Sequence, residues 1–253
     1  MSVGERIATA EGKRRYVRTL FATIADRYDL ITVWLSYGQD RRWKRRLIAL
    51  TQARSGVRAL DLATGTGDIA FGLAAAGARV TGLDITLRMI ELAREKLARS
   101  VQSRDRAPRA TAPRDQPQIT FLVGDMLALP FPDHAFDIVT TGYGLRNVPN
   151  LSTAIDEIGR VLAPGGQLLS LDFNRPSNAV VRAAYLAYLS VVGAAVGWLL
   201  HRDPDTYRYI PASIRTYPGA AAVARLFEAG GFSRVRCLPV FGGLMAIHHA
   251  TRD

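Results

Sequence analysis

Short apolar runs alternate with longer helical segments through the middle of the chain. The apolar runs, typical of buried strands, are RALDLA, ARVTGLD, ITFLVGD, FDIVTTGY and GQLLSLDF. The segments between them are DIAFGLAAAG, LRMIELAREKLARS and LSTAIDEIGRVLAPGG. Continuous apolar runs indicate strands that are buried on both faces, and strands that alternate with helices form parallel sheets. The sequence therefore predicts an α/β fold with a doubly wound, mostly parallel sheet.

Three regions lie outside this alternation. Residues 1–50 look mainly helical and precede the first strand, so we expect a helical cap over the ligand-binding edge of the sheet. Residues 100–118 are rich in Arg, Pro and Ser and lack apolar periodicity, which predicts a flexible surface loop. Residues 179–200 are apolar over a length that could span a bilayer, which takes about 20 residues. Because this stretch interrupts an α/β domain and contains Arg182, we favour a buried or membrane-facing helix over a span.

Composition narrows the class of protein. The chain has 253 residues, of which 48% are hydrophobic, and this is enough for a substantial core. Its single cysteine, Cys237, excludes an intramolecular disulfide framework, and we expect it to be a small buried residue rather than a nucleophile. The N-terminus lacks the apolar core of a signal peptide, so we expect a cytoplasmic protein.

The formal net charge of +11 raises the question of an anionic partner. Only three of the 33 basic residues are lysines, namely Lys13, Lys44 and Lys96, so 30 are arginines. Such an arginine bias can follow from genome base composition alone, and we prefer that explanation. Anionic membrane lipid is the second choice, and nucleic acid, which we do not expect as a partner, is the third.

The segment DLATGTGD, residues 61–68, has the form of a strand that turns tightly into a helix. Gly65, Thr66 and Gly67 would form the turn, where a missing Cβ lets a ligand approach the backbone. With Ala70, the segment also satisfies the dinucleotide pattern G-x-G-x-x-G/A, and Asp84 ends the next strand, where a ribose-binding acid would lie. This pattern alone suits either a nicotinamide dinucleotide or S-adenosylmethionine.

Two further acids separate these cofactors. Asp61 opens the glycine turn, where a carboxylate would repel a pyrophosphate but can serve an ammonium group. Asp125 follows the third strand and can accept a hydrogen bond from the exocyclic amine of adenine, with Met126 against the adenine ring. Acids after three successive strands, together with a glycine turn, fit S-adenosylmethionine better than NAD. An NAD-dependent dehydrogenase stays the second candidate, and a nonenzymatic membrane-surface or RNA-binding protein the third.

Several motifs give the chain a resemblance to a known family. DLATGTGD, GLDIT, GDMLALPFPDHAFD, GLRNV, RVLAPGG and DTYRYIPASIRTYP occur in the order found in the ubiquinone/menaquinone biosynthesis C-methyltransferases. The resemblance implies a class I, Rossmann-like fold with a seven-stranded sheet and S-adenosylmethionine as cofactor. It also implies methylation of a ring carbon of a polyprenylated quinol, either demethylmenaquinol or a methoxy-benzoquinol, or else of another small lipophilic substrate. Gly142 stands where many relatives have Ser near the cofactor.

The expected reaction sets requirements for the site. An aromatic carbon is a poor nucleophile until a hydroxyl ortho or para to it loses its proton, so the enzyme must stabilise a phenolate and align the ring carbon. Arg146 in GLRN is our candidate ligand for the phenolate oxygen, and Asn147 is the candidate for orienting it. Arginine stays protonated and is not a simple base, so the resemblance and its strand position make His248 the preferred proton acceptor. Further residues expected in the quinol pocket or its lid are Tyr207, Tyr209 and Arg215.

The resemblance also divides the chain and suggests its surroundings. We expect one domain, 1–253, whose parts are the cap (1–50), the cofactor-binding core (51–175), an apolar substrate-side insertion (176–218) and a C-terminal helix with strands (219–253). A polyprenyl quinol lies in the bilayer, so we expect peripheral association with the inner face of the membrane, assisted by the basic segment RRWKRR at 41–46. A homodimer is left open. No metal-ligand spacing occurs, and transfer from a sulfonium needs no metal.

Overall fold

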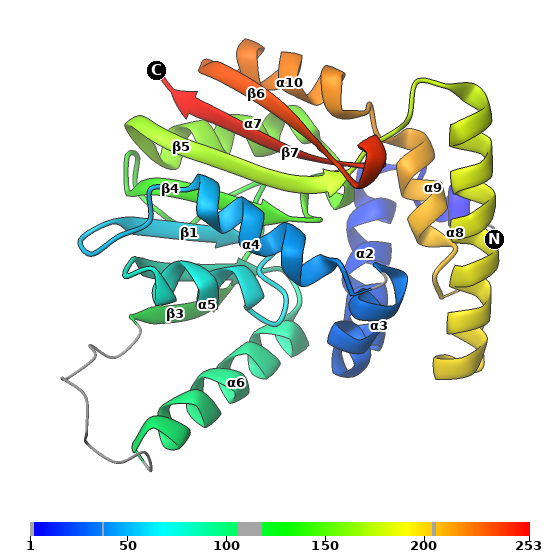
Figure 1. Cartoon of the computed structure of the whole chain (residues 1–253), viewed down its shortest axis with the longest axis horizontal. Coiled ribbons are helices and arrows are strands. Elements are labelled where there is room, and N and C mark those ends of the chain that lie inside the picture. The colour runs from blue at the N-terminus through cyan, green and yellow to red at the C-terminus, as the bar shows by residue number, and fades with distance from the viewer. Residues whose placement is uncertain (1–2, 37, 106–117, 204–205) are drawn as a thin grey trace.

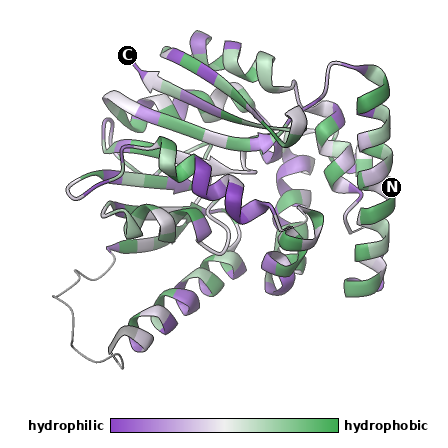
Figure 2. Ribbon diagram, viewed as in Figure 1, coloured by the Kyte–Doolittle hydropathy of each residue, from purple (hydrophilic) through white to green (hydrophobic). Residues whose placement is uncertain are grey.

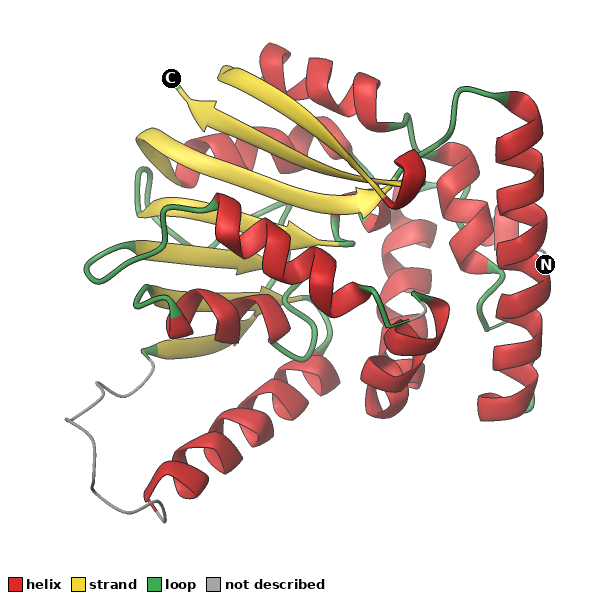
Figure 3. Cartoon of the chain, viewed as in Figure 1, coloured by secondary structure: helices red, strands yellow, loops and turns green. Residues whose placement is uncertain are grey.

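The fold is built on one seven-stranded sheet with helices on both faces (Figures 1 and 3). A computed structural model describes all residues except 1–2, 37, 106–117 and 204–205. The strand order is β3-β2-β1-β4-β5-β7-β6. The strands are β1 (Arg58–Leu62), β2 (Arg79–Asp84), β3 (Ile119–Val123), β4 (Phe136–Gly142), β5 (Leu162–Phe173), β6 (Phe232–Val240) and β7 (Met245–Arg252).

The first five strands are parallel, and β7 runs antiparallel between β5 and β6. Strand order reverses at β1, which has β2 on one side and β4 on the other. At such a switch point, the connections that follow the two neighbouring strands, here β1 and β4, run to opposite faces of the sheet, and a crevice for a ligand opens between them. The predicted α/β fold with a doubly wound, mostly parallel sheet is confirmed.

Helices cover both faces of the sheet, lie at its carboxyl edge, and stand beyond that edge. They are α1 (Val3–Arg6), α2 (Ala10–Ile24), α3 (Tyr28–Leu35), α4 (Asp40–Leu50), α5 (Asp68–Ala75), α6 (Leu87–Asp105), α7 (Leu151–Val161), α8 (Ala179–His201), α9 (Tyr209–Thr216) and α10 (Ala220–Ala229). Three short 3₁₀ turns complete the described chain, namely η1 (Ala25–Arg27), η2 (Leu145–Asn147) and η3 (Phe241–Gly243).

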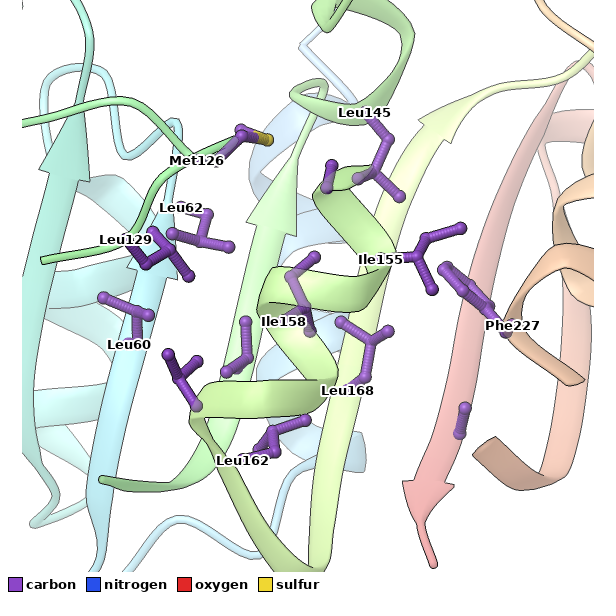
Figure 4. Packing of buried hydrophobic residues seen from close by; sticks show 14 of the residues in the cluster. Leu60, Leu62, Met126, Leu129, Leu145, Ile155, Ile158, Leu162, Leu168 and Phe227 are labelled. Atoms are coloured by element: carbon purple, nitrogen blue, oxygen red, sulfur yellow. The ribbon is translucent and has the colours of Figure 1, made fainter. Parts of the chain in front are cut away.

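Two hydrophobic clusters fix the faces of the sheet. On one face, Ile155 and Ile158 of α7 and Phe227 of α10 pack on leucines of the strands (Figure 4). On the other face, side chains of α4, α5 and α6 pack on the sheet, among them Trp43 and Leu73. Strands that are covered on both sides need apolar residues at consecutive positions, which is the pattern the sequence shows.

The N-terminal segment divides into two parts. Val17 and Phe21 of α2, together with Tyr28 of α3, line the ligand-side pockets at the carboxyl edge. In contrast, most of α4 packs on the sheet face, where Leu47 is fully buried. From α4, Trp43 and Lys44 still reach the ligand side, where they line, respectively, the second pocket and the small recess described below.

Helix α8 stands at the outer side of the α2 and α3 region (Figure 1). Tyr185 and Leu189 face inward and pack with Ile214 of α9, and Val196 packs with Ile31 of α3. It is the one helix in the described chain that is long and apolar enough to cross a membrane, although part of it is buried against the protein. The hydropathy colouring shows that apolar residues occur along most of its length (Figure 2).

Three local predictions need correction. Helix α6 continues to Asp105, so residues 100–105 are helical and not part of a loop, while 106–117 lie outside the described residues. Helix α7 ends at Val161, and the LAPGG segment belongs to β5, where the pairing with β4 shifts register between Phe136 and Ile138. Cys237 is exposed, because it lies on β6 at the edge of the sheet.

Candidate functional site

The glycine turn after β1 contains left-handed backbone at Ala63, Gly65 and Gly67, with φ values of 51°, 54° and 92°. A Cβ on Gly67 would lie 2.9 Å from Phe121 Cζ, so this position accepts only glycine. Gly65 has more room, since the nearest atom to such a Cβ would be Tyr28 Cε1 at 3.6 Å. Gly65 lines the pocket that opens at this edge of the sheet, described below, whereas Gly67 shapes the turn that begins α5.

Asp84 ends β2 and fixes the turn. Its two carboxylate oxygens accept hydrogen bonds from the backbone N–H groups of Gly65 (3.0 Å) and Thr86 (2.8 Å). Burial raises the pKa of Asp84, and these two backbone hydrogen bonds oppose the rise. Each oxygen can accept a second hydrogen bond, so the carboxylate is able to hold two ribose hydroxyls.

Asp61 lies deeper, at the end of β1. Its carboxylate accepts hydrogen bonds from the hydroxyls of Thr64 (2.6 Å) and Thr140 (2.8 Å), and the residue is 1% exposed. Burial raises the pKa of Asp61 to about 6, although the two hydroxyl hydrogen bonds oppose the shift. The side chain borders a small recess that Gly65, Thr66, Lys44 and Asp68 also line. Asp68 is already paired with Lys44, so Asp61 is the better candidate there to receive an ammonium group.

The third predicted acid, Asp125, follows β3 and faces α2. Its Oδ2 pairs with Arg14 at 2.7 Å, while its Oδ1 accepts a hydrogen bond from the backbone N–H of Leu127 at 3.0 Å. Asp125, Met126, Asp84 and Gly142 border one pocket of about 710 Å³, a volume that includes its open mouth. Of the residues predicted for the cofactor, the structure thus brings five to this pocket, namely these four and Gly65, while Asp61 and Thr66 line the small recess and Gly67 lines neither. The walls contributed by the cap are Arg14, Val17, Phe21 and Tyr28.

The GLRN segment forms the turn η2 directly after β4, and it is held from three sides. Arg146 is 6% exposed, and its Nε lies 3.2 Å from Asp172 Oδ1 at the end of β5. The Arg146 backbone N–H donates to the same carboxylate at 3.1 Å, and a guanidinium N–H donates to Ser213 of α9 at 3.1 Å. Lys13 of α2 donates to the carbonyls of Arg146 (2.9 Å) and Val148 (2.7 Å).

Asn147 joins the turn to its surroundings. Its side-chain N–H donates to the carbonyl of Tyr143 at 2.7 Å, and its Oδ1 accepts from the Tyr209 hydroxyl and from Arg146, each at 3.0 Å. This network fixes the orientation of the amide, because each side-chain atom has a partner of the required type. Asn147 lines the cofactor pocket, while Arg146 lines a second pocket.

The second pocket is apolar and adjoins the first. It measures about 860 Å³, again including its mouth, and Phe21, Tyr28 and Tyr143 line both pockets. Arg146 is the charged residue among its lining side chains. Most of the other walls come from α2, α3, α8, α9 and the segment before α9, with single residues from α4, β5, η3 and β7. They include the predicted Tyr207 and Tyr209 with Tyr185, Leu189 and Ile210.

Two predicted site residues lie elsewhere. His248 is 2% exposed in the interior of β7, and its ring nitrogens contact Ser170 Oγ (3.3 Å) and the Ala220 carbonyl (2.9 Å). It lines neither pocket, and burial lowers its pKa. This position does not support a role as proton acceptor and suits a structural one. Arg215 is exposed on α9 and borders neither pocket.

Sequence reasoning missed several residues of the site. Asp172 ends β5 and so follows the same rule that identified Asp61, Asp84 and Asp125; the signal was present but unused. Tyr143 lies between two glycines after β4 and has a left-handed φ of 62°, a strained conformation that is frequent at functional sites. Lys13 could not be found in this way, because its partners are backbone carbonyls of a segment more than 130 positions away.

The cofactor pocket suits S-adenosylmethionine by the chemistry of its donors. Buried carboxylates follow β1 and β2, and a third acid follows β3; carboxylates at these positions would repel a pyrophosphate. Asp84 and Asp125 border this pocket, and Asp61 borders the adjoining small recess. The fold and this site define a class I S-adenosylmethionine-dependent methyltransferase.

Comparison with known sequences gives the family. Residues 9–252 match the model of the ubiE/COQ5 methyltransferase family, and the chain belongs to this family. A demethylmenaquinone methyltransferase of Thermus thermophilus is 40% identical over 235 residues, which cover 92% of this chain and 100% of that protein. A ubiquinone/menaquinone biosynthesis C-methyltransferase of Shewanella pealeana is 36% identical and covers 97% of this chain and 94% of its own.

Solved structures agree on the fold. A SAM-dependent methyltransferase from Thermotoga maritima has a TM-score of 0.61 at 16% identity and covers 93% of this chain and 99% of its own. Another, from Aquifex aeolicus, has a TM-score of 0.56 at 16% identity, with 85% and 90% covered. The family and these neighbours together make S-adenosylmethionine the cofactor of this enzyme.

Replacing Asp84 with Asn should weaken cofactor binding by about 10- to 100-fold, because a hydrogen bond to a charged group is worth about 1.5–3 kcal/mol. Asn keeps one acceptor for the turn, so the fold should survive. Isothermal titration calorimetry with S-adenosylmethionine measures the change. Asp133→Asn, at a carboxylate that is 66% exposed, is the matched control and should leave affinity unaltered. Unaltered affinity in Asp84→Asn would remove this residue from the cofactor site.

Cofactor affinity should also depend on pH through Asp61. With a pKa of about 6, only about a tenth of the Asp61 carboxyl is ionised at pH 5, so S-adenosylmethionine should bind about tenfold more weakly there than at pH 7. Asp61→Asn should remove this difference. The stability of the cofactor-free protein should change in the opposite direction. Because burial raises the pKa of the Asp61 carboxyl from 3.8 to about 6, the contribution of this group to the free energy of unfolding falls as pH rises between these values. Calorimetric titrations with S-adenosylmethionine at pH 5 and pH 7 measure the difference. If Asp61→Asn shows the same pH dependence of affinity as wild type, Asp61 is not the group responsible.

Proposed function

We propose that the protein transfers a methyl group from S-adenosylmethionine to a ring carbon of a prenylated quinol, with demethylmenaquinol as the preferred substrate. The observation that carries this proposal is the apolar, aromatic-lined pocket that adjoins the cofactor pocket at Phe21, Tyr28 and Tyr143. A flat ring with an isoprenoid chain requires such a pocket, and its reacting edge must face the cofactor. When bound, S-adenosylmethionine supplies an electrophilic methyl group on a positively charged sulfonium.

Within the cofactor pocket, we assign the ribose hydroxyls to Asp84, the ammonium group to Asp61 and the adenine amine to Asp125. The Arg14–Asp125 ion pair then has to loosen when adenine enters, since it uses one carboxylate oxygen. Arg14 is exposed, so it can turn into solvent at little cost. Gly65 and Gly142 leave room for the cofactor next to the strands.

Arg146 is the residue that we assign to the phenolate. Its guanidinium is buried, permanently charged and already oriented by Asp172 and Ser213, so little reorganisation is needed when negative charge develops on the substrate oxygen. Its guanidinium carbon lies 4.7 Å from the centre of the Phe173 ring, which also holds it in place. We assign Tyr207 and Tyr209 to the walls around the quinol ring.

The names of the relatives favour a quinone-pathway substrate but do not choose between the two ring types. The relative from Thermus thermophilus is named for demethylmenaquinone, and that from Shewanella pealeana for both ubiquinone and menaquinone. We prefer the naphthoquinol because the more similar of these two relatives carries that name alone. A nicotinamide dinucleotide is disfavoured by the carboxylates at the strand ends.

We also propose that the enzyme docks on the inner face of the membrane through the outer face of α8. Tyr185 and Leu189 on the inner face line the apolar pocket. The large exposed residues of the outer face are all apolar, with exposed fractions between 48% and 77%: Val180, Val181, Val191, Trp198 and Leu199. Such a patch marks a site for another apolar surface, and the bilayer is where a prenyl chain resides.

The basic segment 41–46 contributes differently from what we expected. Trp43 is 8% exposed and packs on Phe241, with ring centroids 5.5 Å apart, so it is not available as an interfacial anchor. Lys44 is also buried, whereas the four arginines of the segment are exposed. We therefore assign only those arginines an electrostatic role near anionic lipid.

The methylation proposal is tested with purified protein, S-adenosylmethionine and reduced demethylmenaquinol, with mass spectrometry of the product. We expect a product that is one methyl group heavier. Arg146→Lys keeps the charge but loses the planar fork, so turnover should fall at least about tenfold while cofactor affinity stays within about twofold. Arg225→Lys, at an exposed position on α10, is the control. Absence of product with every quinol sinks the proposed function, and equal losses of turnover and affinity would place Arg146 in the cofactor site.

The docking proposal is tested by co-sedimentation with vesicles that contain anionic lipid. Wild-type protein should bind at low salt, and the double variant Val191→Glu with Trp198→Glu should bind at least about tenfold more weakly, since two apolar contacts become charged. Val123→Glu, at an apolar position on β3 that is 48% exposed, should bind like wild type. If the double variant sediments like wild type, the α8 face is not the docking surface. If it only converts a dimer to a monomer in size-exclusion chromatography, the face is a homodimer contact instead.

A further inference from the structure

A continuous chain of hydrogen bonds and ion pairs leads from the apolar pocket to the surface. The hydroxyl of Tyr143 donates to Asp40 Oδ1 at 2.6 Å, and the other oxygen of Asp40 lies 2.7 Å from Lys44 Nζ. Lys44 Nζ also donates to Asp68 Oδ2 at 3.0 Å. Tyr143 lines both pockets, and the side chain of Asp68 is 41% exposed, so the chain of contacts has one end at the substrate and the other in solvent.

The intermediate members are enclosed. Asp40 is 2% exposed and the Lys44 side chain 11%. Desolvation lowers the pKa of Lys44, but Asp40 and Asp68 outweigh this effect and raise it above its ordinary value, so the ammonium persists. Burial, followed by the charge of Asp40, raises the pKa of Tyr143, which therefore holds its proton and cannot act as a phenolate base. Tyr143 can therefore take part in proton transfer only by accepting one proton while it donates its own.

The titratable groups around Tyr143 come from three elements. Asp40 and Lys44 belong to α4, Tyr28 to α3, and Asp172 to β5. Tyr28 is itself neutral, because burial raises its pKa to about 12. Asp172 is paired with Arg146. Asp40 is thus the carboxylate that is hydrogen-bonded to the Tyr143 hydroxyl and connected to an exit.

We propose a proton relay that takes the hydroxyl proton of the substrate from the apolar pocket to solvent, with the members Tyr143, Asp40, Lys44 and Asp68 in that order. The proposal rests on the quinol methylation argued above. Replacement of a ring hydrogen by a methyl group releases one proton overall. The pocket is lined mainly by apolar and aromatic side chains, so this chain of polar groups offers the proton a path to solvent that remains when a prenylated substrate fills the pocket.

The transfers balance at every member. The electron pair of the substrate O–H bond stays on the substrate oxygen, and its proton goes to a lone pair of the Tyr143 oxygen as Tyr143 gives its own proton to Asp40. Lys44 gives one proton to Asp68 and takes the proton from Asp40. Asp68 then loses a proton to water. Each member returns to its initial charge, and the negative charge remains on the substrate beside Arg146.

The test compares Tyr143→Phe and Asp40→Asn with wild type on demethylmenaquinol between pH 6 and 9. At pH 7, kcat should fall about 100-fold, the size typical for loss of acid–base catalysis, while S-adenosylmethionine affinity is unchanged. The deficit should shrink by about tenfold per pH unit, because solvent then ionises the substrate directly. The control is Tyr217→Phe, which removes a buried hydroxyl without a hydrogen-bond partner in the described chain and should retain the wild-type profile.

A second readout does not depend on turnover. After a jump in pH, bound 1-naphthol should form naphtholate faster in wild type and Tyr217→Phe than in Tyr143→Phe, because a relay changes the rate at which the proton leaves and not the equilibrium pKa. Tyr143→Phe alone keeps the test valid if Asp40→Asn fails to fold. A wild-type enzyme without activity on any quinol defeats the proposed function. If wild type is active and Tyr143→Phe has the same kcat, the relay is overturned. It is also overturned if the loss of kcat in Tyr143→Phe is constant with pH and the rate of naphtholate formation is unchanged.

Discussion

The buried ion pair between Arg146 and Asp172 is the contact on which the site depends. Its members are 6% and 2% exposed, and four elements meet there: β5 supplies the carboxylate, η2 the arginine, α9 a hydroxyl and α2 the lysine that binds the arginine's carbonyl. Removing one member of a buried pair typically costs about 3–5 kcal/mol, because the other charge is left without compensation. Arg146 is therefore one of the residues through which the cap and the substrate-side helices are coupled.

Burial of charge follows a consistent arrangement at the carboxyl edge of the sheet. The carboxylates of Asp61, Asp84 and Asp172 all follow parallel strands, and burial raises the pKa of each. Each is held by short hydrogen bonds from the chain itself, which reduces the cost of desolvation. Asp61 and Asp84 accept one hydrogen bond at each oxygen, whereas Asp172 Oδ1 has two partners, the Phe173 N–H and Arg146 Nε. The same structural position thus provides two carboxylates with acceptor capacity to spare and one that supports the GLRN turn.

The sequence was sufficient for the sheet and for the cofactor side of the site, because both follow from local rules. Apolar runs identify buried strands, and residues at the ends of parallel strands meet at one edge, which brings Asp61, Asp84 and Asp125 together. The substrate side depends on contacts between distant segments, such as Tyr143 with Asp40 or Lys13 with the GLRN turn, and no local pattern encodes them. The resemblance and the strand position misplaced His248, whose ring faces inward but is covered there by α10 rather than by a pocket.

The scarcity of lysine has a consequence once the side chains are placed. All three ammonium groups lie around the site: Lys13 at the turn, Lys44 at Asp40 and Asp68, and Lys96 at Thr66 and Asp68. Every other cationic side chain carries a guanidinium, which does not react with amine-selective acylating reagents. Apart from the α-amino group, amine-selective acylation of this protein is therefore confined to groups that hold the cap, the glycine turn and the sheet together. The enclosed Lys44, whose side chain is 11% exposed, should react more slowly than Lys96, whose side chain is 28% exposed.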